Sequence, residues 1–192
     1  RILVRHGLEL MKQTQNVGLH ALMEVNQILP WQDGKLGAFH IGFVLGPCLN
    51  ASGRLDSAQR AMELLDSKTR EAAVAQAAFL KQLNDSRKEM TEEYVKIAVE
   101  MIESGPLKDD RVLVVFLPDC HESIAGIIAG RIRERYYRPT FVLTRGEEGV
   151  KGSARSIEGY HIYEEMTKCS SFFTKYGGHK MAAGLSMREE DV

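Results

Sequence analysis

One short stretch near the end of the chain, KYGGHKMAAGL, combines glycines with a histidine in a pattern that suits anion binding. His179 directly follows Gly177 and Gly178, and small residues come after it. Glycine permits positive φ and lets a ligand approach the backbone closely, so His179 could then donate to a phosphate. The alternative is a helix that ends at the two glycines and leaves a surface histidine. The residues alone leave both interpretations open.

A second stretch, KGSARSI, offers a hydroxyl beside a guanidinium. If it forms a strand, Ser153 and Arg155 share one face, because side chains alternate across a strand. This pair suits two oxygens of one phosphate, since arginine supplies a planar bidentate fork. An ordinary solvated edge strand is the alternative.

A third stretch, GPCLNASGRLDSA, places Asn50, Ser52 and Arg54 among glycine and proline, ahead of an expected helix. Such a turn can present backbone N–H groups and one arginine to an anion. A plain loop in which Asp56 or Ser57 caps the helix is the alternative. The stretch is not a P-loop, because the GK[ST] ending is missing.

The stretch HESIAGIIAGRIRERYYRP carries further polar and small residues. Gly126 and Gly130, four residues apart, predict close packing of a helix on a sheet. His121 and Glu122 follow an apparent strand end, where α/β sheets usually bind ligands, and a helix cap is their competing role. Three arginines at helical spacing predict one basic face, for which a solvated surface is the favoured interpretation: Arg131, Arg135 and Arg138.

Several catalytic patterns are missing from the sequence. There is no clustered Asp/His set of the kind that a two-metal hydrolase needs, no GxSxG elbow and no indicated Cys–His pair. The three cysteines, Cys48, Cys120 and Cys169, are widely spaced without a CxxC pair. Neither a disulfide framework nor a zinc site is expected, and a reducing cytoplasm fits this pattern.

Composition limits the class of protein. The chain has 192 residues, 44% of them hydrophobic, with a formal net charge of -1. This length allows one core, or a compact domain with an appended helical segment. No apolar run approaches the roughly 18 residues needed to span a bilayer, and no signal peptide is recognisable. The near-zero charge argues against a generally basic nucleic-acid binder but allows a local basic groove.

Patterns along the chain predict the elements that position these stretches. Residues 1–28 have helical spacing, residues 29–55 are rich in Gly and Pro and should be loop-like, and residues 57–104 favour helices. The last of these should be one long helix ending at Gly105-Pro106. Beyond it, a strand, a helix and a strand predict a βαβ unit in an α/β layer. The expected elements are strands at 111–118, 138–144, 149–157 and from 182, with helices at 122–137 and 160–173.

Taken together, the stretches LGPCLNASGRLDSAQRAMELL, LNDSRKEMTEEYVKIAVEMI, HESIAGIIAGRIRERYYRPTFVLT, GSARSI and YGGHKMAAGL resemble the RecJ single-stranded-DNA-specific exonucleases, which are DHH phosphoesterases. The GGH..AAG motif alone marks only the wider DHHA1 domain. With the NASGR turn and the long helix it points to RecJ, in register over essentially the whole chain.

The resemblance implies a two-domain enzyme that removes nucleotides from single-stranded DNA in the 5′ to 3′ direction. Mn²⁺ or Mg²⁺ would be held by Asp and His residues of a DHH domain, whose motifs are not present here, and none would be bound by this piece. Because the chain opens on Arg1 and ends on REEDV, it is expected to be cut from a longer protein. Residues 1–105 would be the connecting helical segment and NASGR loop after a missing DHH domain. Residues 106–192 would be a DHHA1 domain, truncated at its C-terminal end, with a mixed β-sheet flanked by helices.

The resemblance also implies roles for individual residues. Asn50 and Arg54 of NASGR, and Ser153 and Arg155 of GSARS, would contact the DNA backbone or its 5′ phosphate. Gly178 and His179 of GGH would lie beside the scissile phosphate, with His179 as the catalytic residue. The expected partners are single-stranded DNA with a 5′ end and the DHH domain, with no membrane. The HESIAG stretch departs from the family pattern, which leaves the contacts of Glu122 and Ser123 open.

Two other functions remain as alternatives. One is a small DHH–DHHA1 phosphodiesterase acting on short oligonucleotides or cyclic dinucleotides, against which the long helical connector argues. The other is a non-catalytic nucleic-acid-binding module, which an upstream DHH domain with intact metal ligands would exclude.

Overall fold

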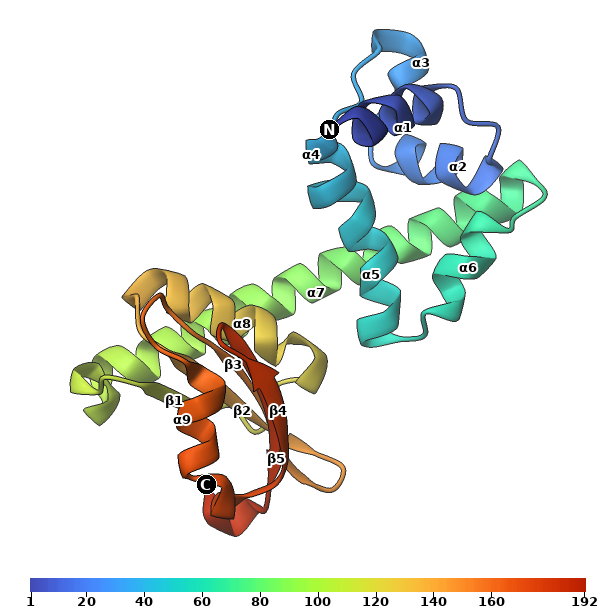
Figure 1. The fold of residues 1–192 in the computed structure, drawn as a ribbon. Coiled ribbons are helices and arrows are strands. Elements are labelled where there is room, and N and C mark those ends of the chain that lie inside the picture. Colours follow the sequence, from blue (N-terminus) through green and yellow to red (C-terminus); the bar gives the residue numbers. More distant parts are fainter. The chain divides into compact units, whose positions relative to one another are not determined.

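The computed structural model describes residues 1–192, apart from the side chain of residue 33. The chain divides into two compact units, residues 1–88 and residues 89–192 (Figure 1). The first is helical, and the second holds a five-stranded mixed sheet with helices. The predicted α/β class, with a helical segment followed by a sheet flanked by helices, is confirmed.

The first unit consists of helices packed around aliphatic side chains. Leu22, Met23, Leu64 and Leu80 are fully buried in its core. Its helices are α1 (Ile2–Lys12), α2 (Val17–Val25), α3 (Pro30–Asp33), α4 (Ala38–His40), a π-helical turn (Ile41–Leu45), α5 (Gly46–Leu55), α6 (Gln59–Leu65) and the first part of α7 (Arg70–Ser104).

The prediction that residues 29–55 are loop-like is wrong, because this segment is largely helical. Pro30 lies in the first turn of α3, where proline costs no hydrogen bond and its fixed φ suits the helix. Pro47 instead follows the π-helical turn Ile41–Leu45, whose backbone is already helical, so it lies within a continuous helical run beside a π-turn. Cys48 and Ala51 of α5 are fully buried in or beside the apolar core. Burial of this face outweighs the low helix propensity of the glycines, so NASGR is part of a helix.

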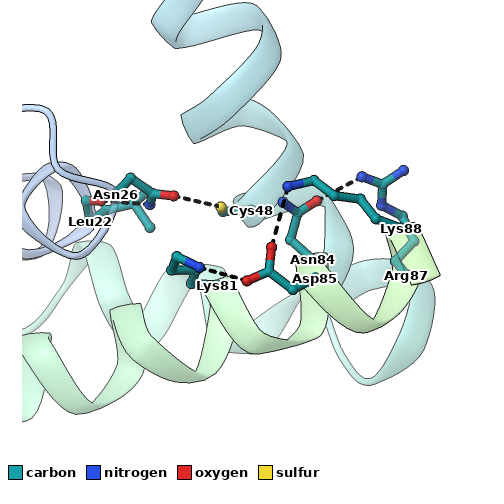
Figure 2. Close-up of polar contacts among 8 residues, drawn as sticks. All are labelled: Leu22, Asn26, Cys48, Lys81, Asn84, Asp85, Arg87 and Lys88. Carbon is teal, nitrogen blue, oxygen red and sulfur yellow. Dashed lines mark hydrogen bonds and ion pairs between the residues drawn. The ribbon is translucent and has the colours of Figure 1, made fainter.

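One polar contact ties α5 to the end of α2, and further polar contacts lie within α7 (Figure 2). The thiol of Cys48 donates to Oδ1 of Asn26, the residue directly after α2, at 3.8 Å, and burial raises the pKa of this thiol. On α7, Asp85 accepts from Lys81 at 2.6 Å and from Lys88 at 3.2 Å. The hydrogen bond from Lys81 is the main reason that the pKa of Asp85 is lowered.

Helices α6 and α7 confirm the helices predicted over residues 57–104, and α7, from Arg70 to Ser104, is the predicted long helix. It ends at Ser104, immediately before Gly105-Pro106. Glycine is common just after a helix, and proline cannot continue one. The last turns of α7 belong to the second unit, where Ala98 and Ile102 are buried. There the hydroxyl of Tyr94 also donates to the carbonyl oxygen of Asp119 at 2.6 Å.

The second unit confirms the predicted βαβ unit. Strand β1 pairs in parallel with β2, and α8 lies between them in the chain, whereas the remaining pairs are antiparallel. The strand order is β1-β2-β3-β5-β4. The elements are β1 (Leu113–Phe116), α8 (Glu122–Tyr136), β2 (Thr140–Gly146), β3 (Gly149–Arg155), α9 (Ile162–Lys168), β4 (Phe173–His179) and β5 (Ala182–Met187), with short 3-10 turns at Pro106–Asp109, Ser170–Phe172 and Glu189–Asp191.

Helices α8 and α9 cover opposite faces of this sheet (Figure 1). On one face, α8 and the end of α7 bury aliphatic side chains of β1 and β2, including Leu113, Val115 and Val142. On the other face, α9 packs with Ile162 and Met166 against β2, β3 and β5. The stretches KGSARSI and KYGGHKMAAGL lie mainly on strands β3, β4 and β5.

Candidate functional site

Strands β3 and β4 lie on either side of β5, and this order brings together the two stretches for which anion binding is predicted. Arg155 of β3 and His179 of β4 both pair with Ala182 of β5. Two residues further along, Ser153 and Gly177 both pair with Gly184. Since side chains alternate across a strand, these two rows lie on one face of the sheet.

This face is the one that α8 meets, and a glycine in α8 leaves room for the arginine. A Cβ atom at Gly126 would lie 2.7 Å from Nη2 of Arg155 and 3.4 Å from Oγ of Ser153. The predicted close packing of helix on sheet is therefore confirmed at Gly126. At Gly130 it is wrong, because a Cβ there would meet nothing within 4 Å. Arg155 also donates from Nη1 to the carbonyl oxygen of Ala154 at 2.8 Å.

A cavity of about 470 Å³ lies between the start of α8 and strands β3, β5 and β4. Its floor is made of small residues, because Gly177 and Gly184 lie side by side there next to Ser153. The cavity is lined by Glu122, Ser123, Ala125, Thr144, Lys151, Gly152, Ser153, Lys175, Tyr176, Gly177, Gly184, Leu185 and Ser186.

The first turn of α8 contributes a carboxylate to this cavity. Oε2 of Glu122 lies 2.6 Å from Nζ of Lys151, and this hydrogen bond raises the pKa of the lysine. His121 occupies the N-cap of α8, where its Nδ1 accepts the backbone N–H of Ser123 at 3.3 Å. The helix-cap role foreseen for His121 is thus the one that the structure shows.

His179 is exposed at the end of β4 with one ring nitrogen occupied. Its Nδ1 accepts the backbone N–H of Met181 at 3.3 Å. In the neutral ring this contact leaves the proton on Nε2, which can donate to an anion. The alternative that Gly177 and Gly178 end a helix is wrong, because both lie within β4.

The two glycines do not use positive φ, contrary to the expectation. Positive φ occurs instead at Gly34, Gly149 and Gly159 among the glycines of the described backbone. Gly178 is required for another reason: a Cβ there would lie 2.5 Å from the carbonyl oxygen of Ala182. The strand pair β4–β5 therefore packs too closely at this point for a side chain.

Comparisons with known proteins show which proteins this chain is similar to. Residues 109–192 match the family described as the DHHA1 domain. The single-stranded-DNA-specific exonuclease RecJ of Bacillus subtilis is 36% identical over the whole of this chain, and that of Escherichia coli 35% over 99% of it. A crystal structure of RecJ from Thermus thermophilus, in complex with Mg²⁺, superposes with a TM-score of 0.83 over 98% of this chain at 31% identity. This chain corresponds to the part of the RecJ proteins that contains the DHHA1 domain.

The chain spans only part of its RecJ relatives. It covers 24% of the length of the Bacillus subtilis protein, 34% of the Escherichia coli protein and 28% of the Thermus thermophilus chain. The DHHA1 match begins at residue 109, whereas the compact units divide between residues 88 and 89. The predicted boundary between residues 105 and 106 lies between these positions and stays a prediction.

The RecJ resemblance also named residues outside the DHHA1 domain. Asn50 and Arg54 lie four residues apart on α5 in the first unit, and both are exposed. The NASGR stretch presents them from a helix rather than from the expected loop. Ser153, Arg155 and His179 are gathered in the second unit. The roles of all these residues as substrate ligands stay predictions.

The predicted basic face of three arginines does not form on α8 of the DHHA1 domain. Tyr137 takes a left-handed conformation at φ 51° and ends the helix after Tyr136. Arg138 therefore lies beyond the helix, where its Nη1 donates to the carbonyl oxygen of Lys108 at 2.7 Å. The residue before a proline disfavours helical backbone, so Pro139 explains why the helix stops short of Arg138.

RecJ relatives have been solved with Mg²⁺ or Mn²⁺. Outside residue 33, no three His, Cys, Asp or Glu side chains of this chain are grouped closely enough to hold a metal ion. The residues described here do not fit such a site, and no metal-dependent step is assigned to them. No helix in the described part of the chain is long and apolar enough to cross a membrane.

Proposed function

We propose that this chain is the substrate-binding part of an exonuclease that removes nucleotides from single-stranded DNA in the 5′ to 3′ direction. The observation that carries the proposal is the placement of Arg155 and His179 on either side of Ala182, beside Ser153 and a glycine floor. RecJ relatives that match this chain from end to end are named as single-stranded-DNA-specific exonucleases.

Each residue of this site has a chemical role in the proposal. The Arg155 guanidinium and the Ser153 hydroxyl would hold oxygens of a backbone or 5′-terminal phosphate, since charge-assisted forks suit phosphate geometry. Nε2 of His179 would donate to the scissile phosphate as negative charge develops on it. Gly178 would lie beside that phosphate through its backbone, next to His179 in the chain.

The remaining parts of the proposed enzyme lie outside this site. Asn50 and Arg54 of α5 would contact the DNA backbone from the first unit. A DHH domain outside this chain would supply the Asp and His ligands of Mn²⁺ or Mg²⁺, in keeping with the metals in the RecJ crystal structures. We expect the enzyme to act in the cytoplasm, where its DNA substrate would be found.

Fluorescence anisotropy of the chain with a short single-stranded DNA tests the proposal. The DNA is compared with a 5′-phosphate and with a 5′-hydroxyl at low salt, and Mn²⁺ is added to parallel samples to detect digestion. We expect salt-sensitive binding that favours the phosphate, without digestion, because phosphate contacts release counterions. Absence of binding at low salt, or binding that does not change with salt, would contradict the proposal.

Variants locate the phosphate contact. Arg155→Ala should weaken binding by about 1–3 kcal/mol, the scale of a charge-assisted hydrogen bond. Arg131→Ala serves as the matched control, because Arg131 is an exposed arginine of α8 outside the rows of residues on β3, β5 and β4. Equal affinities of the two variants would remove Arg155 from the phosphate site.

A further inference from the structure

A third row of polar residues lies on the same face of the sheet as Arg155. Lys151 of β3 and Lys175 of β4 both pair with Ser186 of β5. All three residues line the same cavity as Ser153. Lys151 and Arg155 are four residues apart on β3, which corresponds to roughly 13 Å along a strand. This distance is too long for Lys151 and Arg155 to contact one phosphate from equivalent positions.

The two lysines of this row differ in their ion pairing. Lys151 is held by Glu122, with 2.6 Å between Nζ and Oε2. Lys175 is exposed and has no ion-pair partner among the residues whose side chains are described. Among the residues that line the cavity, two ammonium groups and one carboxylate leave an excess of one positive charge, whereas Glu147 and Glu148 act on Lys151 from outside the lining. The hydroxyl of Ser186 lies between the two lysines and can donate to an anion.

A row of small residues separates this end of the cavity from Arg155, which is not itself among the residues that line the cavity. Gly177 and Gly184 form the row between them, and a Cβ atom at Gly177 would meet nothing within 4 Å. A chain of linked phosphates could therefore lie along the strands over Gly184 and Gly177, with the Ser153 hydroxyl at the β3 side of the same row. A single small anion would use only one end.

We propose that Lys151, Ser186 and Lys175 form a second phosphate subsite, which binds the phosphate next to the one held by Ser153 and Arg155. This proposal rests on the proposed function, because it places the same single-stranded nucleic acid on the same face. Glu122 holds Lys151 in position when the subsite is empty and competes with the incoming phosphate for its ammonium group. The role of Glu122, which the sequence left open, is then to limit how tightly the DNA backbone is held.

The charges predict opposite effects of two substitutions. Lys175→Ala removes one phosphate contact and should weaken binding of a 5′-phosphorylated oligodeoxythymidine about two- to fivefold, as expected for an exposed charge. Its slope of log affinity against log salt should fall by about 0.7, the value per phosphate contact on a single strand. Glu122→Gln keeps the shape of the side chain but removes its charge, so binding should strengthen about two- to fivefold.

The controls match each charge change outside the cavity. Lys96→Ala removes an exposed lysine of α7, and Glu165→Gln removes a carboxylate that pairs with Lys168 at 2.6 Å on α9. Neither should alter the affinity beyond the small effect of net charge. Circular dichroism spectra of all variants should match that of the parent chain, since the substituted side chains are exposed.

The ligand with a single phosphate separates the two subsites. The Arg155→Ala variant should bind thymidine 5′-monophosphate more weakly than the parent chain does, whereas the Lys175→Ala variant should bind it equally well.

If Lys175→Ala and Glu122→Gln leave oligonucleotide affinity and salt slope unchanged while Arg155→Ala weakens binding, the second subsite is wrong and the proposed function stands. If Lys175→Ala weakens the monophosphate as much as the oligonucleotide, one phosphate contacts both ends and the two-subsite proposal is wrong. If neither the parent chain nor any variant binds either ligand, the proposed function itself fails.

Discussion

The two faces of the five-stranded sheet carry different kinds of residue on the same strands. On the face that α9 covers, β2, β3 and β5 present Leu143, Ala154 and Leu185, which are buried. On the other face, the same β3 and β5 present lysine, serine, arginine and glycine, much of it exposed. Strand β4 follows the same division, with Tyr176 packed against the apolar cluster and His179 exposed.

Packing explains one face and does not explain the other. Burial of aliphatic side chains is sufficient reason for the composition of the α9 face. On the opposite face, α8 and α7 bury the aliphatic residues of β1 and β2, whereas the rows on β3, β5 and β4 contribute little to that core. Their glycines and cations cost stability or leave it unchanged, so a ligand is the simplest reason for them. The two faces should therefore respond differently to substitution.

The largest effect on folding should come from the apolar face. Ile162 of α9 is fully buried in its cluster, so Ile162→Ala should lower the free energy of unfolding by about 2–5 kcal/mol. Thr167→Ala, on the exposed side of the same helix, should change it by less than about 0.5 kcal/mol. Urea denaturation monitored by circular dichroism measures both. Similar values would mean that α9 does not support the sheet as described.

Two adjacent glycines test both faces within one strand. The Cβ atom of Gly178→Ala would meet backbone of β5, at 2.5 Å from the carbonyl oxygen of Ala182, so this substitution should destabilise the fold by about 1–3 kcal/mol. Gly177→Ala places its methyl group in open space over the cavity and should be tolerated by the fold. It should weaken binding of single-stranded DNA, because the methyl group occupies the floor. Equal unfolding free energies of the two variants would contradict the assignment of these glycines to opposite faces.

The βαβ part of the fold was predictable from the sequence because its signals are local. RVLVVFLP is a continuous apolar run typical of a buried strand, and the helix and strand after it are equally distinct. Strand β4 was not predicted, since most of its residues are exposed and it lacks an apolar alternation of its own. Helix α5 was missed because glycine and proline suggested a loop, whereas burial of Cys48 and Ala51 stabilises a helix.

The candidate site was predictable only in parts. The sequence indicated that Ser153 and Arg155 share a face, because alternation along one strand is a local property. It gave no indication that Arg155 and His179 flank the same residue, since this depends on β5 lying between β3 and β4. The ion pair of Glu122 with Lys151 joins the start of α8 to β3, and it depends on tertiary packing in the same way. The opposite charges of these two residues were the signal available.

A pair of glycines in α8 should separate stability from binding. Gly126→Ala would bring a methyl group to 2.7 Å from Nη2 of Arg155, at the end of a flexible side chain that can move away. Alanine favours a helix over glycine by roughly 0.5–1 kcal/mol, so the fold should be as stable or slightly more stable while DNA binding weakens. Gly130→Ala meets nothing within 4 Å and should stabilise the helix without affecting binding. Unchanged DNA affinity of Gly126→Ala would show that the position of Arg155 against α8 does not matter for the site.

The smallest effect concerns two exposed ion pairs of equal length, one on each side of the sheet. Lys151 pairs with Glu122, and Lys168 on α9 pairs with Glu165, each at 2.6 Å. In both cases a hydrogen bond to the carboxylate is the main reason that the lysine pKa is raised above its usual 10.5. The contribution of each pair to stability is therefore fully present below that pH and is lost as the pH rises through the raised pKa.

Titration followed by NMR of the lysine side chains distinguishes the two pairs. Glu122→Gln should lower the pKa of Lys151 toward its usual value and leave that of Lys168 unchanged, whereas Glu165→Gln should do the reverse. In the parent chain, a bound 5′-phosphorylated oligonucleotide should shift the side-chain signal of Lys151 but not that of Lys168, because only Lys151 lines the cavity. The two pairs have the same chemistry and the same distance, so a ligand response at Lys151 alone would have to come from the face of the sheet on which it lies. Equal responses at both lysines would instead indicate binding governed by net charge, without a preferred face.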